Sequence, residues 1–329
     1  MPLPIGRPMR DVFGETVSDL ADNDSRIVVL DGDLGTSTKA DVFQARHPER
    51  FLQMGIAEQN MLGVAAGLTT VGFKPFISTF VSFAVVRSLD QVRVLIAQPS
   101  LPVRITAGYA GLFTGAAGKT HQIFDDISIM RAMPNMVVVS PADDVEARRV
   151  IEFAAAYDDG PIYVRLVRDA TQRFFDDGYE FVLGRAVIVR KGTDVTLIST
   201  GSQTPRVMEA AEMLHTQGIS AHVLHVPTLK PLDAGAIVEA AERTGFVVTV
   251  EEHTILGGLG GAVAEVLSEI RPTPMRRIGI ADRYGESASN ADLLEIFGLS
   301  AASVSKQVAK IIAEHDRTPS RAAAVPKSH

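Results

Sequence analysis

Short apolar segments alternate with amphipathic helical segments along most of this chain, and this alternation constrains its fold more than any other feature. In the first half, strands are predicted at residues 26–30, 51–55, 74–80, 102–107, 136–139 and 162–166. Helices are predicted at residues 9–21 and at about 83–97, and Pro141-Ala-Asp-Asp144 is predicted to cap a helix that runs to Tyr157. A second series of strands, one of them at residues 246–250, runs from about residue 194 to residue 280, again with helices between them. Strands that alternate with helices at this spacing predict parallel sheets covered by helices on both faces. We therefore expect an α/β fold made of two doubly wound domains with mostly parallel sheets.

The length of 329 residues also favours two domains, because a single hydrophobic core rarely grows that large. The charged, aromatic and irregular stretch 168–184 separates the two series and is predicted to be the linker. We expect a first domain over residues 1–183 and a second over residues 184–316. Residues 317–329 are rich in Ala, Pro, Ser and basic residues and are predicted to form a disordered tail.

The composition excludes several classes of protein. A net charge of −7 argues against a nucleic-acid-binding protein. The chain has no cysteine, so disulfides and thiolate metal sites are absent. The N-terminus lacks the organisation of a signal peptide, and no run approaches the roughly 20 apolar residues of a membrane span. A cytoplasmic protein without membrane or nucleic-acid partners is the expectation.

Glu58 is the first candidate for a functional residue. It lies where a strand-like run passes into a helix rich in small residues, with Gly63 and Gly67 on that helix. An acid in the first turn is often a solvated residue favoured by the helix dipole. The other interpretation is a buried functional acid, and neighbouring motifs have to decide between the two.

Other candidates follow the ends of predicted strands. Asp31 and Asp33 are either turn residues or acids that face a ligand, with equal support for both. His121 lies in a long glycine-rich loop, where a histidine is either structural or suited to acid–base work. Phe80 and Phe83 flank a strand end and are either core residues or a platform for a planar ligand.

Some polar groups carry weaker signals. The sequence Gly115-Ala-Ala-Gly-Lys119-Thr120 lacks the first glycine of a phosphate-binding loop, because Phe113 stands there, so an NTPase is excluded. Glu251 and Glu252 are predicted to be surface or turn residues, and His253 to line an interface.

Several of these pieces occur in an order that resembles the C-terminal half of transketolases and of 1-deoxyxylulose-5-phosphate synthases. The resemblance covers residues 9–315, nearly the whole ordered chain. In the first domain it rests on Asp31-Gly-Asp33-Leu, Gly55-Ile-Ala-Glu58-Gln, Thr79-Phe80, Gly118-Lys-Thr-His121-Gln, Pro134-Asn and Ser140-Pro-Ala-Asp143. In the second domain it rests on Thr200-Gly-Ser and Ile280-Ala-Asp-Arg-Tyr-Gly285.

The resemblance implies a dependence on thiamine diphosphate. In that family a glutamate at the position of Glu58 hydrogen-bonds N1′ of the aminopyrimidine and promotes its imino tautomer. This requires a carboxyl group that holds or shares a proton. Burial favours that form and the helix N-terminus opposes it, and we expect burial to dominate. Phe80 and Phe83 match aromatic residues that flank the aminopyrimidine, and Asp33 matches an acid beside the thiamine.

The resemblance also implies substrate-binding residues. His121 matches a histidine that contacts the substrate as a hydrogen-bond donor or proton shuttle. Ser37 and Arg168 match positions that bind the sugar phosphate, and Arg10 is a looser match for a third. Arginine suits phosphate because its planar fork is always charged and binds two oxygens at once.

The sequence departs from the family pattern in places that concern the substrate and the cofactor. The half that normally holds Mg²⁺ and the diphosphate is missing, so no metal site is expected on this chain. Ala117 stands where transketolases have an acid that binds sugar hydroxyls. Tyr109 replaces a histidine associated with the substrate, and Val86 replaces an aromatic residue of the cofactor pocket.

The resemblance therefore implies the C-terminal subunit of a split transketolase, which transfers a two-carbon ketol unit from a ketose, expected to be phosphorylated, to an aldose. An N-terminal partner subunit would carry the diphosphate site with Mg²⁺ or Ca²⁺, in an α2β2 assembly in which this chain also dimerises. Three alternatives stay open: the β subunit of a 2-oxo acid dehydrogenase, an enzyme like 1-deoxyxylulose-5-phosphate synthase, and a non-catalytic scaffold subunit.

Overall fold

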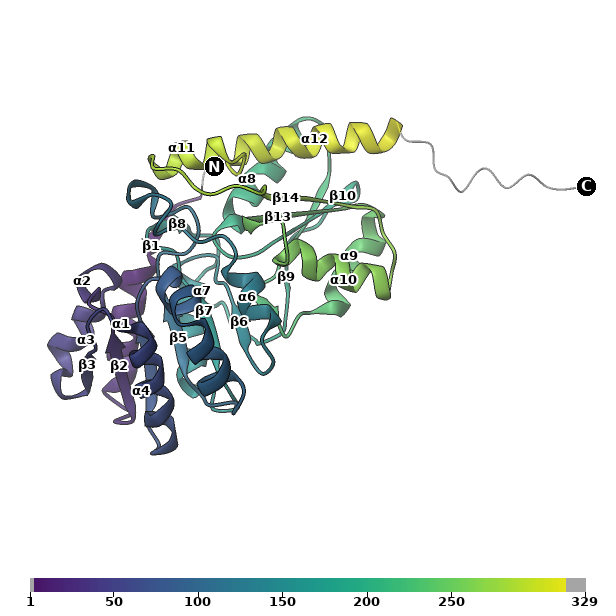
Figure 1. Ribbon diagram of the computed structural model, residues 1–329. Coiled ribbons are helices and arrows are strands. Elements are labelled where there is room, and N and C mark those ends of the chain that lie inside the picture. Colours follow the sequence, from purple (N-terminus) through teal and green to yellow (C-terminus); the bar gives the residue numbers. More distant parts are fainter. Residues whose placement is uncertain (1–2, 318–329) are drawn as a thin grey trace, which may run out of the picture.

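The computed structural model describes residues 3–317, which form two α/β units packed side by side (Figure 1). The first unit is built on a seven-stranded sheet in the order β12-β6-β7-β5-β4-β2-β3, and the second on a five-stranded sheet in the order β14-β13-β10-β11-β9. Within these two sheets, all neighbouring strands are parallel except the pairs β12–β6 and β11–β9. The expected two-domain, mostly parallel α/β fold is confirmed.

The strands of the first sheet are short and mostly buried on both faces, as parallel strands covered by helices must be. They are β2 (Ile27–Asp31), β3 (Phe51–Gln53), β4 (Lys74–Ser78), β5 (Arg104–Ala107), β6 (Val137–Val139), β7 (Ile162–Arg165) and β12 (Thr228–Lys230). The last of these comes from the second half of the chain and pairs antiparallel with β6. The C-terminal half thus supplies an edge strand to the N-terminal sheet, which the sequence did not predict.

Helices cover both faces of the first sheet. One face carries α1 (Met9–Ala21), α3 (Ala40–Arg46) and α7 (Asp144–Ala156), whose apolar residues share one core cluster. The other face carries α4 (Glu58–Thr70), η2 (Ser82–Arg87), α5 (Leu89–Gln91), η3 (Val92–Ala97) and α6 (Asp126–Ala132). The helix predicted near residues 83–97 is therefore broken into two π-helical segments around one short α-helical turn. The short α2 (Gly35–Thr38) and η1 (Pro48–Arg50) connect these elements.

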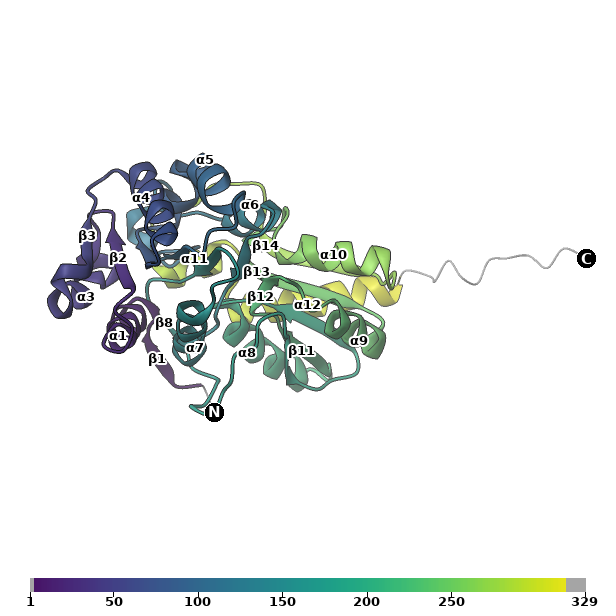
Figure 2. The same cartoon turned by 90° about the horizontal axis from the view of Figure 1, so that it is seen from below.

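The second sheet is covered in the same way. Its strands are β9 (Val187–Arg190), β10 (Val195–Ser199), β11 (Ala221–His225), β13 (Val247–Thr254) and β14 (Met275–Ile280). Helices α8 (Gln203–Thr216), α11 (Asn290–Ile296) and α12 (Ala301–Arg317) pack on one face, and α9 (Ala234–Thr244) and α10 (Leu259–Glu269) on the other. Apolar residues of α9 and α10 belong to the same core cluster as those of α4 and α6, so one core spans both units (Figure 2).

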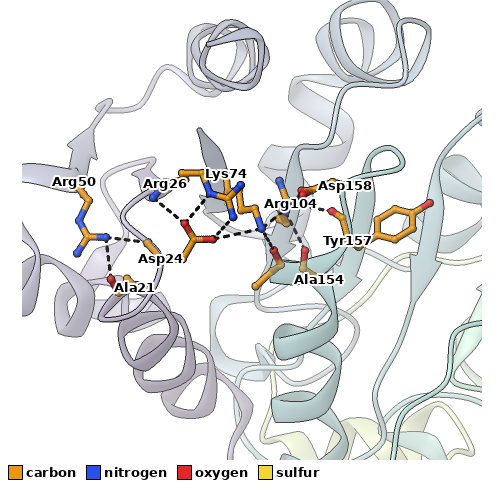
Figure 3. Close-up of polar contacts among 10 residues, drawn as sticks. Ala21, Asp24, Arg26, Arg50, Lys74, Arg104, Ala154, Tyr157 and Asp158 are labelled. Atoms are coloured by element: carbon orange, nitrogen blue, oxygen red, sulfur yellow. Dashed lines mark hydrogen bonds and ion pairs between the residues drawn. The ribbon is translucent and has the colours of Figure 1, made fainter. Parts of the chain in front are cut away.

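A polar network closes the amino edge of the first sheet (Figure 3). Arg104 is fully buried, and its guanidinium donates to the carbonyls of Ala154 (2.9 Å) and Tyr157 (2.6 Å) and to the carboxylate of Asp158. Lys74 Nζ donates to Ala155 O (2.8 Å) and lies 3.4 Å from Asp24. These cations satisfy carbonyls at the end of α7 that have no partner within the helix. The buried charges of Arg104 and Lys74 at this edge are therefore explained by their hydrogen bonds to the end of α7.

The interface between the units is also polar, and here one prediction was wrong. Glu251 and Glu252 are buried, with 0% and 3% of their surface exposed, instead of lying at the surface. Both lie in β13, a central strand, which runs four residues beyond its predicted end at Val250. Glu252 accepts hydrogen bonds from Leu112 N (2.7 Å) and from Arg206 (2.6 Å), so it ties the two units together. Burial of these acids is possible because backbone amides and a guanidinium pair with them.

The remaining differences concern short or peripheral elements. The strands β1 (Ile5–Pro8) and β8 (Ala170–Gln172) form a two-stranded sheet, so the predicted linker is partly ordered. The predicted tail begins at Arg317, which is the last residue of α12; residues 318–329 lie outside the described residues.

One segment of the described chain, Asn290–His315, is long and apolar enough to cross a membrane by length and composition alone. It comprises α11 and α12, and Gly298 between them has a positive φ of 70°. The α12 helix packs against α8 through core residues such as Val304 and Val308 (Figure 1). An apolar face of this kind is explained by packing against the domain core, so the segment is weak evidence for a membrane span.

Candidate active site

The candidate residues gather at the carboxyl edge of the first sheet. Strand β2 ends at Asp31, β4 at Ser78, β5 at Ala107 and β7 at Arg165. The loops that follow these strands carry Asp33, Phe80, Tyr109 and Arg168, and the loop after β3 leads to Glu58. Ligands bind at this edge in open α/β sheets because parallel strands all end there. The opposite edge is closed by the network of Figure 3.

Glu58 is the first residue of α4 and only 2% of it is exposed. Nη1 of Arg87 donates to both of its carboxylate oxygens, at 2.8 and 2.9 Å. The same guanidinium lies over the ring of Phe83, 4.1 Å from its centroid. The expectation of a buried acid at this position is confirmed, and the solvated alternative is excluded. The sequence analysis did not identify Arg87 as a partner of Glu58. The available signal was that Arg87 ends the helical segment that carries Phe83.

The loop after β2 passes directly beside this acid. A Cβ placed on Gly32 would lie 3.6 Å from Glu58 Cγ and 3.1 Å from Thr79 Oγ1. Asp31 is buried, and its Oδ2 accepts hydrogen bonds from the amides of Leu34 (3.0 Å) and Gly35 (3.1 Å). Burial raises the pKa of Asp31. Asp31 thus shapes the loop, whereas Asp33 is exposed on it with a φ of 63°.

Four rings form a cluster above this edge. Phe80 and Phe83 are stacked with centroids 5.7 Å apart, and Tyr109 stacks on Phe80 at 3.8 Å. The ring of His121 meets both phenylalanines edge-on, at 5.9 and 5.7 Å. Its Nδ1 lies 2.9 Å from Thr120 Oγ1. The glycine-rich loop therefore brings the histidine onto the aromatic pair, which its distance in the sequence did not reveal.

Two arginines meet at the hydroxyl of Tyr109. Arg168 Nε donates to that oxygen at 3.1 Å and Arg10 Nη1 at 3.4 Å, while the hydroxyl donates to Ser37 O at 3.3 Å. Tyr109 has a φ of 66°, a strained conformation for a residue with a side chain. Two guanidinium groups are thus held around one hydroxyl, and Arg168 also pairs with the carboxylate of Asp169. Guanidinium donors gathered in this way suit an anion.

Residues around these arginines enclose a cavity of about 770 Å³. Its lining includes Ser37, Phe80, Tyr109, His121 and Arg168. It also includes Ser287, Ala288, Ser289 and Asn290 from the second unit, none of which the sequence singled out. The cavity has the size of a site for a small molecule.

The residues present fit thiamine diphosphate in part. A buried carboxylate, two stacked rings and a histidine converge on one place, and Thr79 Oγ1 and Asp31 Oδ1 are buried there without a hydrogen-bond partner among the described residues. Unpaired buried polar atoms of this kind can bind a water molecule or a ligand. Residues 3–317 contain no group of three or more histidines and acids arranged to hold a metal ion. The fit is thus to the pyrimidine half of the cofactor.

Comparisons with known proteins agree with this geometry. The family described as "Transketolase, pyrimidine binding domain" matches residues 6–173, and "Transketolase, C-terminal domain" matches residues 184–304. The chain belongs to the transketolase family. A solved chain described as "Split gene transketolase, inactive beta4 tetramer" superposes on this transketolase chain with a TM-score of 0.85 and 44% identity, over 94% of this chain and 99% of the other.

Two curated relatives are named as transketolase subunits. A 6-deoxy-6-sulfo-D-fructose transketolase subunit from Clostridium sp. is 41% identical over 89% of this chain and 91% of its own length. An apulose-4-phosphate transketolase subunit from Phocaeicola vulgatus is 37% identical over 92% of this chain and 97% of its own length. The transketolase chain described here therefore corresponds to the C-terminal subunit of a split transketolase.

Proposed function

We propose that this chain, together with an N-terminal partner subunit, transfers a two-carbon ketol unit from a ketose to an aldose with thiamine diphosphate. The observation that carries the proposal is the buried carboxylate of Glu58 beside the stacked rings of Phe80 and Phe83. The transketolase family depends on this cofactor, and we assign Glu58 the role of the family's glutamate at the aminopyrimidine.

When bound, thiamine diphosphate supplies the nucleophilic carbon that takes up the two-carbon unit. Glu58 would bind a ring nitrogen of the aminopyrimidine and hold or share a proton there. Phe80 and Phe83 would orient that ring between flat apolar faces, and Asp33 would lie beside the thiamine. The apolar cluster also excludes water from the carboxyl group, which strengthens its hydrogen bond to a ligand.

We assign His121 a role on substrate oxygens. Its imidazole lies against both phenylalanines and lines the cavity that leads to the arginines. A histidine in that position can donate a hydrogen bond to a substrate hydroxyl or pass a proton to it.

The far end of the cavity fits an anionic group of the sugar. Arg10, Arg168 and the hydroxyl of Tyr109 converge there, with Ser37 beside them. The relatives act on phosphorylated or sulfonated sugars by name, and both groups present three oxygens to such donors. The arginines therefore favour a ketose with an anionic end. Ala117 lines the same cavity and offers no acceptor to the sugar hydroxyls.

The proposal includes a partner, because this chain corresponds to the C-terminal part of a transketolase and the proposed site on it is for the pyrimidine end of the cofactor. The partner subunit would hold Mg²⁺ or Ca²⁺ and the diphosphate, within an α2β2 assembly. The similar solved chain is described as an inactive β4 tetramer, which supports a subunit that associates with itself but needs another chain for activity.

The test is reconstitution with the N-terminal subunit, Mg²⁺ and thiamine diphosphate, followed by an assay for ketol transfer from phosphorylated and sulfonated ketoses. We expect transfer by the complex and weak cofactor binding by this chain alone. Tight, Mg²⁺-dependent binding by the isolated chain would overturn the split-subunit proposal. Release of CO₂ from 2-oxo acids without ketol transfer would favour the dehydrogenase or synthase alternatives, and inactivity of the complex would favour the scaffold alternative.

A further inference from the structure

The second unit forms one wall of the substrate cavity, through residues 287–290 just before and at the start of α11. In both ribbon views α11 lies at the junction of the two units (Figures 1 and 2). We propose that Asn290 is a positioning residue that sets the geometry of this cavity from the C-terminal domain. The inference deepens the proposed function and rests on it for its kinetic part.

The first contact of Asn290 is with the glycine-rich loop. Its Oδ1 accepts a hydrogen bond from Gly115 N at 3.1 Å. Two neighbouring hydrogen bonds also join this segment to the glycine-rich loop: Ser287 Oγ donates to Ala116 O at 3.0 Å, and Ala288 N donates to Gly115 O at 3.3 Å. The loop that carries His121 is therefore held by backbone and side-chain bonds from the other unit.

The loop and this segment approach each other very closely. A Cβ placed on Gly115 would overlap Ala288 O and lie 2.6 Å from Asn290 Oδ1. Contacts that short cannot exist, so the absence of a side chain at Gly115 is needed for the two segments to meet. The close fit leaves the loop little freedom to shift while these bonds are intact.

The second contact of Asn290 is with the anion site. Its Nδ2 donates to Asp169 Oδ2 at 2.7 Å, while the other oxygen of Asp169 accepts a hydrogen bond from Arg168. Asp169 is thus shared between an amide and a guanidinium. The amide holds one carboxylate oxygen away from Arg168, which leaves donors of that arginine free for a substrate anion.

The position of Asn290 is itself fixed. Ser289 caps α11, accepting a hydrogen bond from Asp292 N at 3.1 Å, and Leu293 of the same helix is buried in the core of the second unit. One amide side chain on a capped helix therefore reaches both the loop of His121 and the partner of Arg168. Its two polar ends have separate targets, so substitutions can separate the two roles.

The decisive variants are Asn290→Asp and Asn290→Ala, in the full chain and in its complex with the partner subunit. Asn290→Asp keeps an acceptor for Gly115 N but faces Asp169 with a second carboxylate, which drives Asp169 onto Arg168. We expect KM for an anionic ketose to rise about tenfold, since one hydrogen bond to a charged group is lost, while KM for an uncharged ketose changes little. Asn290→Ala also removes the acceptor for Gly115 N. In this variant the Gly115 amide should exchange its hydrogen faster than in the wild type, and this can be measured on the chain without its partner.

Glu265→Gln is the control, because Glu265 also pairs across the units, with Arg131 at 2.8 Å, but does not line the cavity. It should leave KM and the exchange of Gly115 unchanged. Equal rises of KM for charged and uncharged ketoses in Asn290→Asp would overturn the role in the anion site. Wild-type exchange in Asn290→Ala would overturn the role in the loop. If the wild-type complex transfers no ketol unit, the proposed function fails, and exchange of Gly115 still decides whether Asn290 holds the loop.

Discussion

Glu58 is the single residue on which the proposed chemistry depends. Its replacement by alanine should lower the turnover of the reconstituted complex by about 10²- to 10⁴-fold, the usual contribution of a positioned acid or base. Assembly with the partner subunit should persist, because Glu58 is buried within this chain. Its ion-pair partner Arg87, whose side chain is already 44% exposed, can turn to solvent when the carboxylate is removed. Turnover is measured by ketol transfer and assembly by size-exclusion chromatography.

Glu49→Ala is the matched control, because Glu49 is an exposed acid of the same domain that lies outside the cavity. It should retain wild-type turnover. Wild-type turnover in Glu58→Ala itself would refute the role given to this acid.

Arg87 shows what a residue outside the recognised motifs contributes. Arg87→Met removes the donor to both oxygens of a buried carboxylate, so the chain should lose about 1 kcal/mol of unfolding free energy, a modest value because the arginine is half-exposed and screened. Adding Glu58→Gln should recover that loss, since the unpaired charge is gone. Urea denaturation of the four proteins in this double-mutant cycle measures the coupling.

The control for this cycle is Arg93→Met. Arg93 pairs with Asp90 at 2.7 Å, but both side chains are more than half exposed, so its loss should change stability little. If Arg87→Met unfolds like Arg93→Met, the ion pair at Glu58 has no measurable strength.

Hydrophobic periodicity predicted the helices and strands that have long buried faces, and it missed the short strands that lack such a face. Helix α1 begins and ends at the predicted residues because its apolar positions recur along a full helical face. The strands β1, β8, β9 and β12 were missed, because three or four residues on the edge of a sheet carry no clear alternation. The acids of β13 were misplaced for a related reason: their buried partners lie far along the chain, and local sequence cannot show them.

The sequence predicted the cap at the start of α7, but it did not predict that the capping residue also binds a distant loop. Asp143 accepts a hydrogen bond from Glu146 N at 2.9 Å, and its second oxygen accepts from the amides of Phe174 and Phe175. Asp143→Ala should therefore lower the free energy of unfolding by about 2 kcal/mol in chemical denaturation, more than an ordinary cap, because two further part-buried amides lose their acceptor.

Asp233→Ala offers the comparison within the same chain. Asp233 caps α9 through Ala236 N at 3.0 Å and accepts from one other amide, that of Ala186. Its removal should cost less than that of Asp143. The order of the two losses tests the argument, and an equal or reversed order contradicts it.

For the whole molecule, the interface between the units sets the response of stability to acid. His253 is fully buried there: its Nδ1 donates to Thr254 O at 2.8 Å, and its Nε2 accepts from Ser128 N. Burial lowers its pKa from 6.5 to about 4. The folded form then binds fewer protons than the unfolded chain, so this group makes stability fall as pH drops from 6.5 toward 4.

Glu251 acts in the opposite direction within the same pH range. Burial raises its pKa from 4.5 to about 7, although the amides of Leu259 and Gly260 donate to it. The folded form then binds more protons than the unfolded chain, so this group makes stability rise as pH drops from 7 toward 4.5. The two side chains lie 3.7 Å apart, and Asp126 and Arg165 also face the imidazole. Their opposite contributions should leave the wild-type chain with a shallow dependence on pH over this range.

Replacing either residue of this pair should reveal the effect of the other on the pH dependence of stability. His253→Gln should gain stability on acidification from pH 6.5 to 5, because the uptake of a proton by Glu251 is then no longer offset by His253. Glu251→Gln should lose stability over the same interval, because the neutral imidazole is then uncompensated. Thermal unfolding at closely spaced pH values measures both slopes, and staying above pH 5 avoids Asp24, whose pKa is lowered by its hydrogen bond with Arg26 and which titrates in stronger acid. Slopes of the same sign in the two variants would show that these groups do not titrate as a compensating pair. Slopes of opposite sign would show that two buried groups at the interface between the units offset each other's effect on stability over this pH range.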